Sequence, residues 1–129
     1  MLDLDRFKRI NDSHGHFTGD LVLKATARML ENEIRINDIV ARFGGEEFVA
    51  VLPGLECDEA MAVAERISKA CSRLHVTAPD GSDVTFRTSI GVSEYISGEE
   101  TENTIRRADD ALYIAKEQRR DRVICNNPA

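Results

Sequence analysis

Residues 41–48 read Ala41-Arg42-Phe43-Gly44-Gly45-Glu46-Glu47-Phe48, and this stretch decides how the rest of the chain is interpreted. Two β-rich runs, 39–43 and 48–52, flank the glycine pair, which predicts two strands joined by a tight hairpin. Glycine suits such a turn because it adopts positive φ without steric cost and leaves the backbone open to a ligand. The hairpin therefore carries two glutamates at the point where its second strand begins.

A second acidic stretch, Met1-Leu2-Asp3-Leu4-Asp5, opens the chain and has the alternation of a buried strand. Asp3 and Asp5 share one face of that strand, and a carboxylate there is costly unless a cation compensates it. If the hairpin lies beside this strand, one glutamate converges with Asp3. Carboxylates with open positions beside them suit Mg²⁺ or Mn²⁺. The alternative is that all these acids are solvated turn residues.

The remaining chain alternates helical and extended patterns. We expect a helical turn over 7–11, a loop at 13–16, and helices over about 20–36, 57–74 and from Thr101, which we interpret as an N-cap. The alternating residues Val84 to Ile90 predict a strand, and Arg122 to Cys125 a last one. This order predicts a single α+β domain spanning 1–129, with a mixed central β-sheet flanked by helices.

Composition excludes several classes of protein. The formal charge of −6 argues against a dedicated nucleic-acid binder, which needs a basic surface. No apolar run is long enough to cross a bilayer, so we expect no membrane contact by this domain. The three cysteines are odd in number and widely spaced, which predicts neither a zinc site nor a disulfide framework and favours a reduced, cytoplasmic location.

Four ordered motifs together resemble the GGDEF family of nucleotidyl cyclases. They are Met1 to Asp12 with Gly15-His16 and Gly19-Asp20, the hairpin Ala41 to Phe48 in its Glu-containing form, Thr88 to Val92, and Ala108 to Lys116. The resemblance implies a fold similar to the nucleotidyl cyclase or polymerase-palm-like (ferredoxin-like) core. It also implies that the chain begins inside the family's first motif, without the family's N-terminal helix.

The resemblance implies a diguanylate cyclase, which condenses two GTP molecules into cyclic di-GMP and two pyrophosphates at an interface between two such domains. Asp3, Glu46 and the carbonyl of Leu4 would hold Mg²⁺ or Mn²⁺. Glu47 would either organise this metal site or assist deprotonation of the attacking hydroxyl. The implied partners are GTP, cyclic di-GMP, a second copy of the domain and an upstream sensory domain.

Six further residues are implied in substrate binding: Asn11 and Asp20 for guanine, and Phe7, Lys8, Lys116 and Arg120 for the phosphates. An ionised Asp accepts from the N1 and N2 hydrogens of guanine, so Asp20 favours GTP over ATP. The alternatives are that Asn11 and Asp20 cap helical turns and that Lys116 and Arg120 form a solvated basic turn. Arg119 and Asp121 depart from the glycine and asparagine common in the family, so the residues on both sides of Arg120 differ from the family pattern.

An Arg-x-x-Asp motif, Arg35 to Asp38, lies just before the hairpin. The resemblance makes it, together with Arg66, an inhibitory site for the product, since arginine offers a planar donor fork to phosphate or guanine. The alternative is a helix-terminal arginine paired with an exposed aspartate.

Two rival functions stay open at the level of sequence. One is a catalytically silent domain that binds GTP or cyclic di-GMP and regulates another protein. The other is a polymerase-palm-like or different nucleotide cyclase that shares the metal carboxylates but not the guanine-reading residues. Retention of Asp3, Glu46, Glu47, Asn11, Asp20 and Lys116 favours the diguanylate cyclase.

Overall fold

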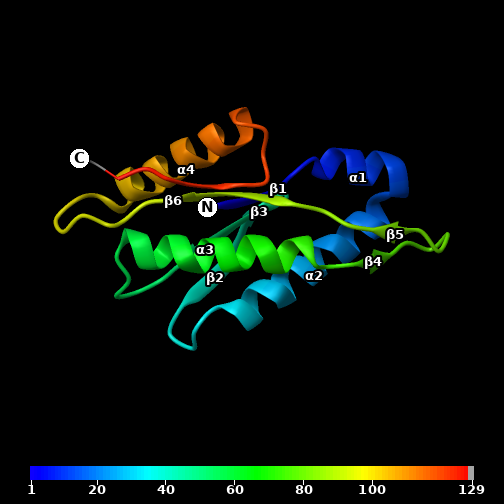
Figure 1. The fold of residues 1–129 in the computed structure, drawn as a ribbon, viewed down its shortest axis with the longest axis horizontal. Helices are drawn as coiled ribbons and strands as arrows, with labels where there is room; N and C mark the ends of the chain where they lie inside the picture. The colour runs from blue at the N-terminus through cyan, green and yellow to red at the C-terminus, as the bar shows by residue number, and fades with distance from the viewer. Residues whose placement is uncertain (128–129) are drawn as a thin grey trace.

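The computed structural model describes residues 1–127, which form a mixed β-sheet with helices on both faces (Figure 1). The elements in chain order are β1 (Leu2–Leu4), α1 (Phe7–His14), α2 (His16–Glu33), β2 (Ile39–Gly44), β3 (Glu47–Val51), α3 (Cys57–Ser72), β4 (Val76–Thr77), β5 (Asp83–Val84), β6 (Thr88–Val92), α4 (Thr101–Glu117) and β7 (Val123–Cys125). None of the helices in this range is both long and apolar enough to span a lipid bilayer.

The five-stranded sheet has the order β2-β3-β1-β6-β7, so the short first strand lies at its centre. β1 runs antiparallel to both neighbours, with Leu2 opposite Phe48 on β3 and opposite Ile90 on β6. β7 adds to β6 in parallel. The predicted mixed sheet is confirmed, and the hairpin does lie beside the opening strand.

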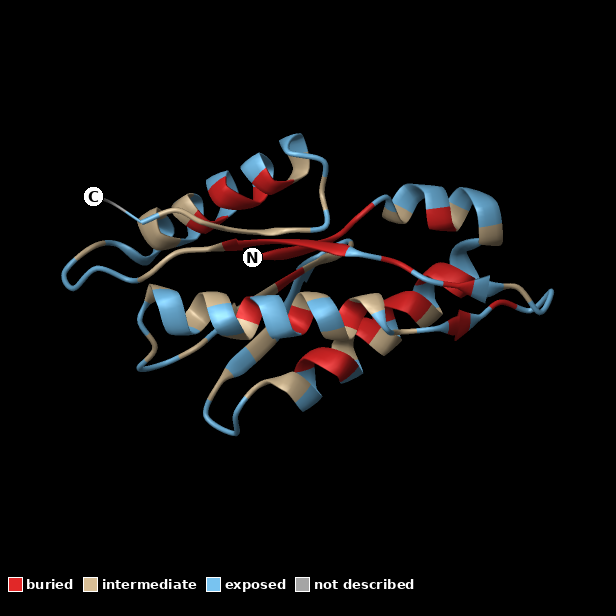
Figure 2. Cartoon of the chain, in the orientation of Figure 1, coloured by how far each residue is buried: buried red, intermediate tan, exposed pale blue. Residues whose placement is uncertain are grey.

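Side chains of β1 alternate between two packed layers. Leu2 and Leu4 join the larger core, together with buried residues of α2 and α3, whereas Met1 packs with Ala108 and Leu112 of α4 on the opposite face. Buried residues run along the central strands in Figure 2, because helices cover both faces of the sheet there. Asp3 is therefore placed on the face that α4 covers.

Gly91 of β6 is the point at which α4 touches the sheet most closely. A Cβ at this position would lie 2.0 Å from the carbonyl oxygen of Ala108 and 2.4 Å from the backbone nitrogen of Leu112. Both contacts are with backbone atoms, which cannot rotate away. A hydrogen atom in place of a side chain is thus what allows α4 to lie directly on β6.

Several predicted boundaries are wrong. Residues Ser13 to His16 are helical except for Gly15, whose φ of 87° breaks one helix from the next, so α2 begins at His16 and ends at Glu33. The predicted strand from Val84 to Ile90 is interrupted after Val84, which pairs with Val76 in a separate small hairpin. That hairpin had no clear signal because each of its strands has only two residues.

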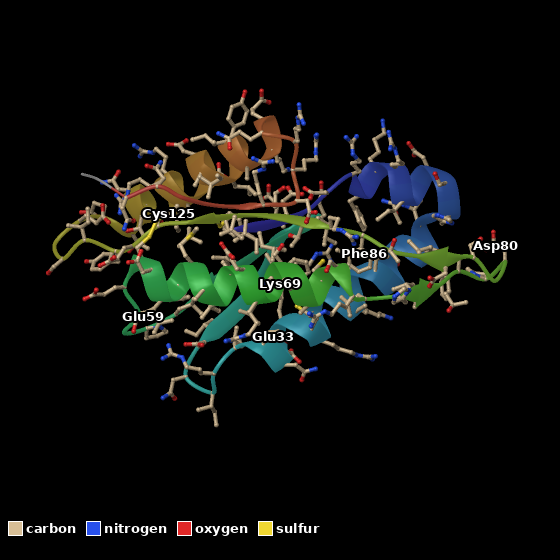
Figure 3. The ribbon with its side chains drawn as sticks, in the orientation of Figure 1. Glu33, Glu59, Lys69, Asp80, Phe86 and Cys125 are labelled. Atoms are coloured by element: carbon tan, nitrogen blue, oxygen red, sulfur yellow. A yellow bond between two sulfur atoms is a disulfide. The ribbon has the colours of Figure 1, made fainter. Side chains whose placement is uncertain are left out.

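Two further expectations fail. Thr101 is the first residue of α4 and makes no capping hydrogen bond, since Glu100 takes the N-cap position. Cys57, at the start of α3, forms a disulfide with Cys125, at the end of β7 (Figure 3). Their separation of 68 residues along the chain gives no local pattern, and only the tertiary fold brings them together. Cys71 is free and buried.

Candidate active site

The centre of the candidate site is Asp3, a carboxylate buried between two strands and a helix. Its residue is only 3% exposed, and β1 sets it directly opposite Glu47 on β3. Within the described part of the chain, its Oδ1 atom is buried and has no hydrogen-bond partner. A buried carboxylate oxygen without a donor is costly, so this atom points to a ligand.

The β2–β3 hairpin brings the second and third acids to Asp3. Gly45 has a φ of 47°, the left-handed conformation that a turn of this kind requires. The turn is fixed against β1 because the Leu4 N–H donates to the Glu46 carbonyl oxygen at 3.3 Å. Glu46 and Glu47 are half-buried and so within reach of solvent, and both carboxylates are near enough to Asp3 to raise its pKa.

Burial and charge act together on Asp3. Desolvation raises the pKa of its carboxyl to about 6; the hydrogen bond from Lys116 opposes this, and the Glu46 and Glu47 carboxylates raise it further. A divalent cation would offset the negative charge of these acids, and it would give the unpartnered Asp3 oxygen a partner. Residues 1–127 contain no group of three or more His, Cys, Asp or Glu side chains placed to hold a metal ion, so a cation here would have fewer side-chain ligands than that. Asp3, Glu46 and the Leu4 carbonyl thus fit an open Mg²⁺ or Mn²⁺ site completed by phosphate and water.

Lys116 lies in the last turn of α4 and reaches down to this carboxylate. Its Nζ donates to Asp3 Oδ2 at 2.6 Å, and its side chain remains 31% exposed. The resemblance implies Lys116 at the triphosphate and does not predict this ion pair with Asp3. The Lys116 ammonium therefore lies at the edge of the same group of charged side chains as Asp3.

Asp5, the next acid on the same face, is held by the protein itself. Its two oxygens accept from Ser89 Oγ at 2.7 Å and from the Asp121 N–H at 2.9 Å. Arg119, Arg120 and Asp121 all have positive φ, so the turn after α4 is strained, and glycine would suit Arg119 better. Sequence reasoning missed this network, which ties the turn carrying Arg120 to β1.

Asn11 and Asp20 come from the two helices that follow β1. A Cβ on Gly19 would lie 1.9 Å from Asn11 Oδ1, so the Asn11 side chain sits directly against the start of α2, next to Asp20. Asn11 Oδ1 is buried without a partner in the described chain, and Asp20 is exposed. The capping alternative for Asp20 is wrong, because α2 begins four residues earlier.

Phe7 and Lys8 form the first turn of α1, directly after the acids of β1. Arg6 precedes them with a φ of 55°, an unusual conformation for a residue with a side chain. The first N–H groups of α1 have no partner in an earlier helical turn, and such groups can bind an anion.

Arg35, Asp38 and Arg66 form a separate cluster, away from the acids. Arg35 pairs with Asp38 at 2.7 Å and donates to the Pro53 carbonyl oxygen at 2.8 Å, and its hydrogen bond lowers the pKa of Asp38. Arg66 of α3 pairs with Glu33 at 2.9 Å, two residues before Arg35. The structure therefore gathers both arginines at the end of α2. Arg35 does pair with Asp38, but the Asp38 side chain is buried, whereas the alternative has an exposed aspartate.

Comparison with known proteins decides the family. The model of the family described as "Diguanylate cyclase, GGDEF domain" matches residues 1–122. The chain belongs to the GGDEF family. Diguanylate cyclase A of Treponema denticola is 43% identical over 124 residues, covering 95% of this chain and 33% of that protein. Diguanylate cyclase DgcM of Escherichia coli is also 43% identical, covering 96% of this chain and 29% of that protein. This GGDEF chain thus spans about a third of these relatives.

Solved structures agree with this GGDEF assignment. Diguanylate cyclase SiaD of Pseudomonas aeruginosa, in complex with its activator SiaC, superposes with a TM-score of 0.92 at 40% identity, over 96% of this chain and 47% of that one. The GGDEF domain of DgcB from Caulobacter crescentus, in complex with c-di-GMP, gives a TM-score of 0.91 at 32% identity, over 96% and 74%. The predicted similarity to the nucleotidyl cyclase fold is confirmed.

Within this GGDEF domain, the predicted site residues other than Phe7, Lys8 and Arg120 divide into three groups. Asp3, Leu4, Glu46, Glu47 and Lys116 meet at one end of β1. Asn11 and Asp20 are neighbours across the α1–α2 junction. Arg35, Asp38 and Arg66 gather at the end of α2.

Proposed function

We propose that this GGDEF domain is a diguanylate cyclase that joins two GTP molecules into cyclic di-GMP, with one GTP held by each of two facing copies. The observation that carries the proposal is the buried Asp3 carboxylate, whose unpartnered oxygen lies beside the acids of the hairpin turn. The names of the relatives support the same activity. In each step a 3′-oxygen forms a bond to the α-phosphorus of the opposite GTP, the α–β phosphoanhydride bond breaks, and pyrophosphate leaves.

The acids act as the cation site in this proposal. Asp3, Glu46 and the Leu4 carbonyl would hold Mg²⁺ or Mn²⁺, and the bound ion would polarise the phosphate and lower the pKa of the attacking hydroxyl. Glu47 is directly opposite Asp3, so it either fixes the position of the other two acids or accepts the hydroxyl proton. The raised pKa of Asp3, about 6, means that burial makes its charged form unfavourable, and a bound cation would compensate that charge.

GTP is selected by the α1–α2 junction in this proposal. The Asp20 carboxylate accepts hydrogen bonds from N1 and N2 of guanine, and the unpartnered Asn11 Oδ1 supplies a further acceptor beside it. The N-terminus of α1 at Phe7 and Lys8 receives the β- and γ-phosphates. Lys116 and Arg120 add positive charge, with Lys116 able to move from Asp3 to a phosphate oxygen once a cation is bound.

The cluster at the end of α2 is proposed to bind the product. Arg35 and Arg66 both present guanidinium groups whose side chains are 51% and 54% exposed, so a phosphate or a guanine edge can reach them. Asp38 is only 2% exposed at its side chain and orients Arg35. Cyclic di-GMP bound here would restrain the domain and slow turnover.

The decisive experiment incubates the chain with GTP or ATP and Mg²⁺ over a range of protein concentrations and separates the products. We expect cyclic di-GMP from GTP alone, with specific activity rising as copies associate. GTP binding without turnover would replace the proposal with a regulatory domain, and turnover of ATP would replace it with another cyclase. Activity that does not depend on protein concentration would contradict the two-copy reaction.

Product inhibition is tested with Arg35→Ala. We expect its inhibition constant for cyclic di-GMP to rise at least about tenfold, the effect of losing a charge-assisted bidentate contact, while the rate without product is kept. Arg73→Ala is the matched control, since Arg73 is an exposed arginine on the C-terminal side of α3. If cyclic di-GMP inhibits both variants equally, Arg35 is not part of a product-binding site.

A cytoplasmic location and an upstream sensory domain complete the proposal. GTP is the substrate, and nucleoside triphosphates are made and kept inside the cell. The Cys57–Cys125 disulfide is unusual for that compartment. Mass spectrometry of the chain from cells whose thiols were trapped by alkylation would report whether it forms there.

A further inference from the structure

Two ion pairs hold the arginines of the cluster at the end of α2, and they differ in how firmly the acid is fixed. The Asp38 side chain is 2% exposed and accepts from Nε, Nη2 and the backbone N–H of Arg35. The Glu33 side chain is 26% exposed, and among the described residues its carboxylate accepts from Arg66 Nε alone, at 2.9 Å. Asp38 is therefore a fixed support. The Glu33 carboxylate, in contrast, reaches solvent and can release its arginine.

Glu33 occupies the edge of the Arg66 guanidinium that suits an anion. Arg66 Nε donates to the Glu33 carboxylate, and Nη2 donates to the Glu33 carbonyl oxygen. Nε and Nη2 together form a donor fork, and bidentate binding of a phosphate needs such a fork. Figure 3 shows Glu33 at the end of α2, beside α3, the helix that carries Arg66. A phosphodiester that takes this fork has to displace Glu33.

The place of Glu33 on its helix explains why it attracts an arginine. Glu33 is the last residue of α2, where free carbonyl groups carry partial negative charge. A carboxylate at this end is unfavourable, and α2, which the structure describes in full, has no basic residue in its last turn. Arg66 of α3 supplies the missing positive charge. Arg66 is thus already paired in the product-free domain, with a negative charge where a phosphate would bind.

We propose that Glu33 sets the affinity of the product site by competing with cyclic di-GMP for Arg66. This inference rests on the proposed function and names a residue that regulates the same inhibitory site. Cyclic di-GMP carries two phosphodiester groups, each with one negative charge, so it seeks the donors that Glu33 holds. Binding breaks one ion pair of Arg66 to form another, which makes the net gain smaller than an unpaired arginine would give. Inhibition consequently begins at a higher concentration of product.

The test measures binding of cyclic di-GMP by isothermal titration calorimetry, without GTP, so it needs no turnover. Glu33→Gln keeps the size of the side chain and a hydrogen-bond acceptor but removes the charge. We expect its dissociation constant to fall at least about threefold, the change that loss of one exposed ion pair produces. Glu33→Ala, which removes the acceptor as well, should bind at least as tightly. Glu31→Gln, an exposed acid in the same last turn of α2, is the matched control and should bind like the unchanged chain.

A second arm separates competition for Arg66 from general repulsion between Glu33 and the anionic product. Arg66→Ala should bind cyclic di-GMP more weakly than the unchanged chain, because it lacks the fork. Adding Glu33→Gln to Arg66→Ala should then change the dissociation constant no further, since the residue for which Glu33 competes is gone. A gain of the same size with and without Arg66 would overturn the inference.

The remaining outcomes distinguish this inference from the proposed function. If the unchanged chain binds cyclic di-GMP and Glu33→Gln and Glu33→Ala bind it no more tightly, the role of Glu33 is wrong and the product site stands. If the chain makes cyclic di-GMP from GTP but neither it nor any variant binds the product at this site, the product site is wrong, and the role of Glu33 falls with it.

Discussion

The two ends of β1 each bury a charge, and they treat it in opposite ways. At its end toward the hairpin, the Asp3 carboxylate has a pKa raised to about 6 and is paired with Lys116. At its start, the Met1 ammonium has a pKa lowered to about 6 and donates only to a backbone carbonyl oxygen. The acid is surrounded by further acids, whereas the ammonium adjoins an apolar cavity.

The surroundings of the two groups indicate that the Asp3 charge has a function, whereas the Met1 charge has none. A protein that buries a carboxylate beside two other acids gains nothing in stability, so this cost points to a cation or substrate. The Met1 ammonium is near the Asp109 and Glu47 carboxylates, which raise its pKa, but the larger effect is desolvation, which lowers it. The ammonium is relieved by losing its charge, as happens when the amine becomes an amide.

The largest expected effect removes one acid from the hairpin end. Glu46→Gln should lower cyclase activity at least about 100-fold, because a group that organises charge at the reacting phosphate is lost. The melting temperature should change little, since Glu46 is half-buried. Steady-state rates with GTP and thermal denaturation measure the two. Glu65→Gln, an exposed acid on α3, is the control and should keep full activity.

Lys116→Met should give the next largest effect, on stability. It leaves Asp3 buried without its cation, at a cost of about 2 kcal/mol; a fully buried pair would lose more, but Lys116 is 31% exposed. Asp3→Asn in the same chain should recover most of that loss. Urea denaturation of both single variants and the double variant measures the coupling. An additive double variant would show that the ion pair contributes nothing; Lys69→Met controls for loss of a surface lysine.

The two buried charges should shape the pH dependence of stability. The raised pKa of Asp3 gives stability that is present below about pH 4 and lost as pH rises through 6. The lowered pKa of Met1 gives stability that is present above pH 8 and lost as pH falls through 6. Together they predict a minimum near pH 6.

Nα-acetylation of Met1 separates these contributions. It should raise the free energy of unfolding by about 2 kcal/mol at pH 5.5, where the ammonium is charged in both states, and by little at pH 9. Asp3→Asn should instead abolish the slope below pH 6. Unfolding free energies between pH 4 and 9 test both. A chain whose pH profile acetylation leaves unchanged would show that the ammonium is solvated.

The smallest effect concerns Val51, which is 51% exposed beside the cavity. Val51→Thr should cost less than about 0.5 kcal/mol in the chain as it stands. Urea denaturation of this variant against the unchanged chain measures the difference. A cost above about 1 kcal/mol would mean that Val51 contributes more to packing than its exposed fraction indicates.

Patterns with a local cause were predicted well from the sequence. The hairpin follows from its glycine pair, and the alternation of Leu2 and Leu4 with Asp3 correctly placed the acid and the core on opposite faces of β1. Helix and strand identity followed the same periodicities. The helix start at His16 was missed because Gly15 alone separates two helices, and a single glycine resembles the loop residues around it.

Contacts between distant residues were beyond sequence reasoning. Lys116 and Asp3 are 113 residues apart, and no pattern in either segment predicts contact with the other. The same holds for Ser89 with Asp5 and for the disulfide between Cys57 and Cys125. These pairs depend on how α4 and β7 lie on the sheet, which periodicity does not specify.

Gly91 sets the height of α4 above the sheet, and this height determines how far Lys116 can reach. The helix backbone at Ala108 and Leu112 lies on Gly91, and Lys116 is one turn beyond Leu112. A methyl group there would act as a spacer, lifting the helix and tilting its last turn away from Asp3. The position of Lys116 beside Asp3 thus depends on Gly91 having no side chain, although Gly91 itself takes no part in the chemistry.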